Sequence, residues 1–249
     1  MFGASQRVAT CFMDRGFPAK ALDFLLSPEQ DILSRRGWYL YLDHLLMMTF
    51  GQLIVCGPPC SLYVWISRGT HQRSTHGHSI LGDVSLLSVR MSNAIVHNFA
   101  WLLKKIYRVR PLYWVVEQPT SSQMFSHPSL KPALKLWKFS LVTTWLGCFG
   151  HILWKGTKLA TNLQGGAKLK RKMTAAQKKA IAQRKKKEIE AAKVAGKKQP
   201  CYYRKDADGR VTGGRDLAST AKYPVQFCAR IFALWYVEFD KMSSKDWHP

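Results

Sequence analysis

Two cysteines beside a pair of prolines form the first group of residues that could do chemistry. Cys56 ends an apolar run that starts at Gln52, and residues 57–60 have the sequence Gly-Pro-Pro-Cys. Consecutive prolines fix two φ angles and disfavour helix before them, so the Cys60 thiol sits on a stiff loop. A thiol nucleophile needs a backbone that holds it in a fixed position. The alternative is that Cys56 and Cys60 are small buried hydrophobes beside a turn.

A carboxylate follows a second apolar run. Residues 112–116, Leu-Tyr-Trp-Val-Val, predict a buried strand, and Glu117 comes directly after them. In open α/β sheets, ligands bind outside the carboxyl ends of the strands. If the two strands are parallel neighbours, Cys60 and Glu117 lie at one crevice. The pair would combine a nucleophile with an acid.

These two motifs, in this order, resemble those of the DNA (cytosine-5) methyltransferases, which place a Pro-Cys loop and a glutamate at neighbouring strand ends. The N-terminal residues resemble the same family's cofactor loop, followed by a helix and an acidic residue that binds ribose, here Asp23. A carboxylate near the adenine would be Asp31, although Asp43 could serve equally. The resemblance implies a site for S-adenosylmethionine made by Phe2, Gly3, Ser5, Asp23, Asp31 and Pro58.

The resemblance also implies a mechanism and a partner. The Cys60 thiolate would add to carbon 6 of a flipped cytosine, so that carbon 5 can take a methyl group from S-adenosylmethionine. Glu117 would hold the base edge and protonate or polarise ring nitrogen 3. The partner would be nucleic acid, with DNA favoured over RNA, and no obligate protein partner is indicated.

The fold that the resemblance implies is α/β, a Rossmann-like S-adenosylmethionine-dependent methyltransferase core with a basic helical insertion. The chain starts directly on the proposed cofactor loop, so this core would lack its first strand. Ala4 and Gln6 also stand where glycine or small residues are expected. These departures favour an alternative function, a catalytically inactive methyltransferase fold that binds nucleic acid through its charge.

The charge of the chain favours polyanionic partners. The formal net charge is +23 over 249 residues, far more than solubility requires. About half of it lies in residues 164–200, which predict an exposed helix starting near Thr174. Binding to phosphate and a disordered, solubilising or nuclear-import segment are both open for this region. The candidate phosphate contacts are Arg68, Arg73, Lys170, Arg171, Lys172, Arg184, Lys185, Lys186 and Lys187.

The remaining segments predict the domain organisation. Residues 134–159 are apolar, and their aromatic and β-branched content favours two core strands over a membrane span. A hairpin turn is predicted at 206–214 and a helix at 219–236. We therefore expect a methyltransferase-like α/β core over 1–163, a basic helical or disordered segment over 164–200, and a hairpin and helix over 201–249 that complete the core.

The cysteines exclude few functions, but they indicate the cellular compartment of the protein. The six cysteines show no Cys-x-x-Cys spacing, so no zinc site is predicted, and no metal site is assigned. The first residues do not show the charged and then apolar pattern of a secretion signal, so secretion is not predicted. Reduced thiols favour a nuclear or cytoplasmic protein.

Overall fold

A four-stranded mixed sheet forms the centre of the computed structural model, which describes residues 6–23, 25–74, 80–109, 111–205, 211–213 and 222–243. The strand order is β1-β2-β4-β3, in which β1 and β2 are parallel and β4 runs antiparallel to both of its neighbours. The strands are β1 (Leu53–Cys56), β2 (Tyr113–Pro119), β3 (Ser140–Trp145) and β4 (Gly156–Thr161).

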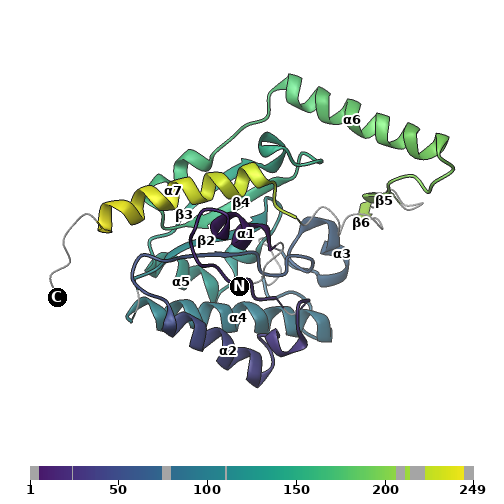
Figure 1. The fold of residues 1–249 in the computed structure, drawn as a ribbon. Coiled ribbons are helices and arrows are strands. Elements are labelled where there is room, and N and C mark those ends of the chain that lie inside the picture. Colours follow the sequence, from purple (N-terminus) through teal and green to yellow (C-terminus); the bar gives the residue numbers. More distant parts are fainter. Residues whose placement is uncertain are drawn as a thin grey trace.

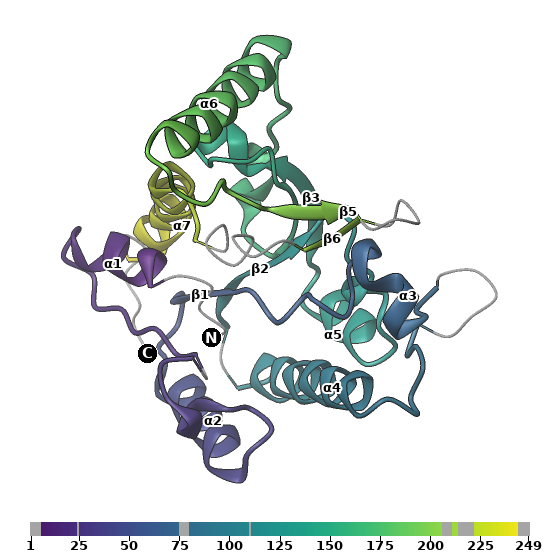
Figure 2. The same cartoon turned by 90° about the vertical axis from the view of Figure 1, so that its right-hand side faces the viewer.

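Helices cover both faces of this sheet (Figure 1, Figure 2). On one face lie α2 (Arg35–Met47), α4 (Leu87–Tyr107) and α5 (Leu130–Leu136), and on the other lie α1 (Arg7–Met13) and α7 (Val225–Ser243). The helix α3 (Arg68–His71) follows β1, and α6 (Ala175–Val194) extends along one side of the molecule. Five short 3-10 helices complete the described elements: Pro28–Gln30, Trp65–Ser67, Met124–Ser126, Leu146–Phe149 and Gln164–Leu169.

The alternation of side chains along β2 explains the three layers. Trp114 and Val116 belong to the cluster packed against α4, whereas Val115 belongs to the cluster packed against α7. Successive strand residues point to opposite faces, so a run of apolar residues without polar interruptions is stable only when both faces are covered. The connection from β1 to β2 passes through α4, as parallel pairing requires. The α/β prediction is confirmed at this level.

The prediction of two strands in residues 134–159 is confirmed in part. Strand β3 lies inside this range, but β4 begins only at Gly156, and the segment opens with the end of helix α5. Lys138 adopts a φ of 53° between that helix and β3.

None of the helices in the described part of the chain is long and apolar enough to cross a membrane.

The predicted basic helix is present, and the C-terminal helix predicted at 219–236 begins at Val225 and continues to Ser243. Helix α6 begins where expected, with Thr174 and Gln177 forming a reciprocal capping box. Strands β5 (Tyr203–Lys205) and β6 (Val211–Gly213) pair antiparallel on either side of residues 206–210, which lie outside the described part. Helix α7 buries Phe227, Ile231 and Trp235 against the sheet, because apolar residues recur at helical spacing.

Candidate active site

The parallel pairing of β1 and β2 brings the two candidate catalytic residues to the same end of the sheet. Cys56 pairs with Val116, so the chain leaves β1 beside the position of Glu117. Glu117 lies inside β2, whereas the sequence placed it just past the strand. The charge of Glu117 raises the pKa of Cys60, so the two groups lie within electrostatic range. The predicted neighbourhood of a thiol and a carboxyl group is therefore present.

The loop that carries Cys60 is tied to the end of β2. The Gln118 side chain donates from Nε2 to the carbonyl of Pro58 at 2.6 Å, and Ser122 Oγ donates to Gln118 Oε1 at 2.7 Å. Beyond the loop, the Tyr63 amide donates to the Cys60 carbonyl at 2.8 Å. The prolines restrict the backbone and these bonds fix its position, so the half-buried Cys60 has a defined mounting.

Glu117 is a buried carboxyl group with one hydrogen bond. Its exposed fraction is 6%, and Oε2 accepts a hydrogen bond from the Tyr223 hydroxyl at 3.1 Å. The Thr157 hydroxyl lies near enough to influence Glu117, but it donates to the Lys155 carbonyl, and Oε1 has no hydrogen-bond partner among the described residues. Burial raises the pKa of Glu117, and Lys155 opposes this. The neutral acid is therefore favoured relative to an exposed glutamate.

The Cys60 thiol is also held in its neutral form. Burial raises the pKa of Cys60 to about 11, and Glu117 acts in the same direction. The positive charge of Lys155 lowers it. Because the thiolate is the nucleophile, Cys60 is weakly reactive at neutral pH in the free protein.

Lys155 and Tyr223 belong to this site, although the sequence did not assign them a role there. Lys155 acts on both Cys60 and Glu117, and it precedes the strand β4 that pairs with β2. The run from Trp154 to Lys158 is weakly similar to a Lys-x-Thr element of some divergent DNA (cytosine-5) methyltransferases, which is the signal that could have indicated Lys155. Tyr223 is brought in only by the packing of α7.

Opposite shifts of the Cys60 titration are expected when its two charged neighbours are changed. Lys155→Met should raise the pKa of Cys60, because a stabilising positive charge is lost, and Glu117→Gln should lower it, because a negative charge is lost. The rate of alkylation by iodoacetamide against pH, followed at Cys60 by mass spectrometry, measures both shifts.

The built-in control is Cys148, whose pKa responds to burial and to Arg171 but to neither substituted residue. Its alkylation profile should stay unchanged in both variants. A shift of Cys60 in the same direction in both variants would contradict the placement of Lys155 and Glu117 around the thiol.

The predicted cofactor residues are only partly described. Phe2, Gly3 and Ser5 lie outside the described residues. The Asp23 side chain is buried and accepts from the amide of Leu25 at 3.0 Å, and Asp31 accepts from the amide of Leu33 at 2.9 Å. Both carboxylates thus stabilise local turns, in the manner of Asx turns.

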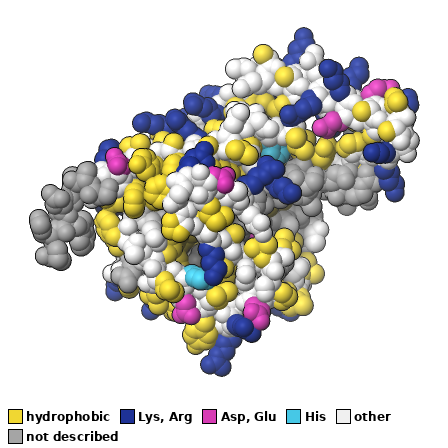
Figure 3. Space-filling view, in the orientation of Figure 1, with side chains coloured by type: hydrophobic (Ala, Val, Ile, Leu, Met, Phe, Trp, Pro, Cys, Tyr) yellow, Lys and Arg dark blue, Asp and Glu magenta, His cyan; other side chains and the backbone are white. Residues whose placement is uncertain are grey.

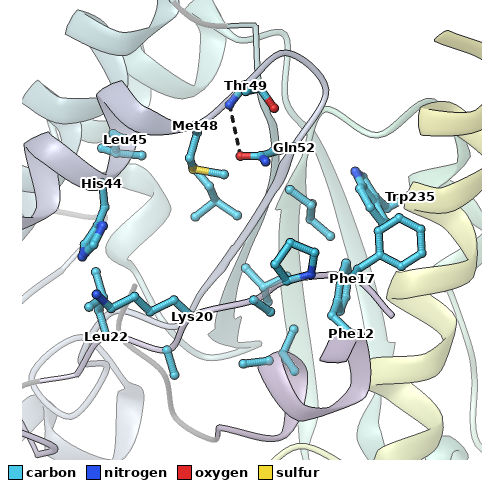
Figure 4. Close-up of a pocket in the computed structure, with 18 of the residues that line it drawn as sticks. Phe12, Phe17, Lys20, Leu22, His44, Leu45, Met48, Thr49, Gln52 and Trp235 are labelled. Carbon is cyan, nitrogen blue, oxygen red and sulfur yellow. Dashed lines mark hydrogen bonds between the residues drawn. The ribbon is translucent and has the colours of Figure 1, made fainter. Parts of the chain in front are cut away.

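A large cavity lies beside β1 (Figure 4). Its volume is about 600 Å³, and its walls are mainly apolar. Tyr223, which donates to Glu117, is part of the wall, so one residue borders both the cavity and the candidate active site. Lys20 and His44 are its ionisable lining residues besides Tyr223, and no carboxylate belongs to its described wall. S-adenosylmethionine carries a sulfonium cation and ribose hydroxyls, so the described wall does not fit this cofactor.

The prediction that Arg73 contacts phosphate is wrong, because its side chain is fully buried. Its Nε donates to the carbonyl of Leu62 at 2.7 Å, and its Nη1 donates to the carbonyl of Ile80 at 2.7 Å. Two groups of α4 complete the set: Asn93 Oδ1 accepts from Nη1 at 2.8 Å and Ser92 Oγ accepts from Nη2 at 2.7 Å. Arg73 therefore joins the segment after Cys60 to α4.

The other candidate phosphate contacts lie at or near the surface. Arg68 is exposed, with Nη2 donating to Ser74 Oγ at 3.0 Å. Figure 3 shows Lys and Arg side chains gathered over the α6 side of the molecule. Arg184 Nη2 donates to the carbonyl of His151 at 3.0 Å, and the ammonium of Lys185 lies 5.7 Å from the centre of the Tyr202 ring. Besides Arg68, the exposed members of this set are Lys170, Arg171, Lys172, Arg184, Lys186 and Lys187.

Helix α6 packs against the rest of the protein through Ile181. Ile181 is its buried residue, and it packs against Gly147, where an added Cβ would lie 2.9 Å from the Ile181 side chain. The glycine therefore allows the helix to approach closely. The exposed basic side chains of α6, which include Lys179, Lys186 and Lys187, can meet a large anionic surface.

Comparisons of the sequence with models of known protein families and with curated proteins find no match. The described residues contain no group of three or more His, Cys, Asp or Glu side chains that could hold a metal ion.

Proposed function

We propose that this chain is a divergent DNA (cytosine-5) methyltransferase-like protein, with Cys60 as nucleophile and Glu117 as the acid that holds the base. The supporting observation is that parallel β1 and β2 present both groups at one end of the sheet. The buried carboxyl group of Glu117, with one oxygen unpaired, is suited to donate to a ring nitrogen.

The proposed chemistry begins with the thiol. The Cys60 thiol gives its proton to water, its sulfur forms a bond to carbon 6 of cytosine, and the electrons of the 5,6 double bond move towards carbon 5. Once carbon 5 carries the methyl group, it loses its hydrogen to water as a proton, and the sulfur leaves carbon 6 so that the double bond forms again. Glu117 in its neutral form donates to ring nitrogen 3 and offsets the charge that develops there. Since Cys60 is protonated in the free protein, its proton must be removed when the base is in place.

S-adenosylmethionine is the proposed methyl donor, and it would supply the methyl group that carbon 5 receives. This part of the proposal depends on the resemblance of Phe2, Gly3 and Ser5 to a cofactor loop. It does not depend on the cavity beside β1, whose wall does not suit the cofactor.

Nucleic-acid binding without catalysis is the second candidate function. The raised pKa of Cys60 favours it, because a thiol with a pKa of about 11 is a poor nucleophile at neutral pH. Covalent capture of the protein by DNA with a reactive cytosine analogue separates the two functions. Capture through Cys60 supports the first, and binding without capture supports the second.

The exposed basic side chains of α6 should contribute directly to DNA affinity. Replacing Lys179, Lys186 and Lys187 by glutamine should reduce the slope of log Kd against log salt by about 2 to 3, since each phosphate contact contributes about 0.9. Fluorescence anisotropy with a 20-base-pair duplex at several salt concentrations measures the slope. The loss should be the same for duplexes of different sequence, because phosphate contacts do not read bases.

A control variant loses three positive charges on a different surface of the protein. Lys104, Lys131 and Lys135 are exposed on α4 and α5, on the opposite side of the sheet from α7. Replacing these three by glutamine should change the slope far less. Equal changes in the two triple variants would mean that net charge alone, and not α6, determines binding.

A further inference from the structure

The cavity beside β1 lies between the two helical layers. Phe12 of α1 and Trp235 of α7 form one wall, and Leu45 of α2 and the adjoining Met48 form the opposite wall (Figure 4). Leu53, Ile54 and Val55 of β1 form its floor. The space therefore continues the plane of the sheet beyond its edge strand.

The edge of β1 that faces this space carries unused backbone groups. The Gln52 carbonyl accepts from the Tyr113 amide, so the alternate residue Ile54 also directs its backbone towards β2. Leu53 and Val55 then direct their N–H and C=O groups to the cavity. Among the described residues, nothing hydrogen-bonds to these groups.

β1 is an edge strand of the sheet, and Leu53 and Val55 are partly buried at the cavity wall. An edge strand with unpaired N–H and C=O groups is a template for pairing with another chain. An apolar small molecule would fill the volume but leave these groups unpaired. An extended polypeptide would satisfy them and fill the volume together.

The size of the cavity agrees with a short strand. A strand residue occupies about 3.3 Å along the strand, about 4.8 Å across the sheet and about 10 Å between packed layers, or about 160 Å³. The cavity of about 600 Å³ therefore holds about four residues. This is the length of β1, which has four residues.

We propose that an extended apolar strand of about four residues, supplied by a partner polypeptide, pairs with the outer edge of β1. Its alternate side chains meet Phe12 and Trp235 on one face and Leu45 and Met48 on the other, so the strand is apolar at every position. Lys20 is exposed at the cavity wall, which favours an acidic residue at one end of the strand. The inference does not depend on the proposed catalytic function.

Strand pairing is tested with two peptides that differ only in their backbone. The probe is fluorescein-labelled Glu-Ile-Val-Ile-Val-Glu with blocked ends, and its twin carries N-methyl groups on the four central residues. Fluorescence anisotropy should show saturable binding of the probe and at least about tenfold weaker binding of the twin, which cannot donate to β1. Equal affinities would overturn the proposal in favour of an apolar ligand site, and so would the absence of binding at about 1 mM probe.

A variant and an assembly measurement complete the test. Val55→Pro removes an outward N–H and leaves the ladder between β1 and β2 intact, so it should weaken probe binding at least about threefold. Sedimentation equilibrium of the protein alone shows whether a second copy occupies the site. Dimers that dissociate when the probe is added would show that a second copy of this chain occupies the site, and would overturn the assignment to a different polypeptide.

Discussion

Cys60→Ser is expected to abolish covalent capture of the protein by DNA that contains 5-azacytosine. A nitrogen at ring position 5 makes carbon 6 electrophilic, so the thiol can add without a methyl donor. The sulfur–carbon bond forms, the double bond between carbon 6 and nitrogen 5 opens, and nitrogen 5 takes the proton that the thiol gives up. Serine is a far weaker nucleophile in this position. Denaturing gel electrophoresis shows the adduct as a band of higher mass.

Cys148→Ser is the matched control, because Cys148 is also a half-buried free cysteine but lies at the attachment of α6. It should be captured like the wild-type protein. Glu117→Gln should be captured more slowly, since the neutral amide cannot protonate the base. Capture of the Cys60→Ser variant at the wild-type rate would remove Cys60 from the proposed mechanism, and no capture of the wild-type protein would leave nucleic-acid binding as the supported function.

Arg73→Met is expected to lower the free energy of unfolding by about 3 to 5 kcal/mol, because several buried acceptors lose their donor and each unsatisfied group costs about 1 to 3 kcal/mol. Methionine fills a similar volume, so the loss comes mainly from the hydrogen bonds. The carbonyls of Leu62 and Ile80 would lose their donors in the interior. The contact of the guanidinium with the Tyr63 ring, 4.0 Å from its centre, would also be lost.

Urea unfolding followed by tryptophan fluorescence measures this loss. Arg68→Met is the control, because Arg68 is exposed five residues away, and its effect should stay within about 0.5 kcal/mol. Arg73→Met should also slow capture at Cys60 in the folded protein, because the segment that follows Cys60 is anchored to α4 through Arg73. A variant as stable as the wild-type protein would contradict the role of Arg73 as an internal anchor.

The sequence alone could not predict the electrostatics of the site. The residue types and order of Cys60 and Glu117 predict a pair at one sheet edge, and β1 and β2 are parallel neighbours, as that prediction requires. The pKa of each group, however, depends on burial and on Lys155, which lies far along the chain. Desolvation is a property of the folded surroundings, so no motif encodes it locally.

Local patterns in the sequence determined the elements. The apolar run before Glu117 determined a strand covered on both faces, Thr174 and Gln177 determined where α6 begins, and the spacing of Phe227 and Ile231 determined the buried face of α7. These features depend on neighbours within a few residues, which is why periodicity and capping identify them.

Only the tertiary structure determined that Arg73 is buried and that the outer edge of β1 is unpaired. An arginine in a basic, histidine-containing loop is typical of a phosphate contact, yet here four acceptors from three segments surround it inside the protein. The unpaired edge of β1 arises because α1, α2 and α7 meet around it without filling the plane of the sheet. Both outcomes depend on contacts between residues distant in the chain, and such contacts are fixed by the packing of the whole molecule.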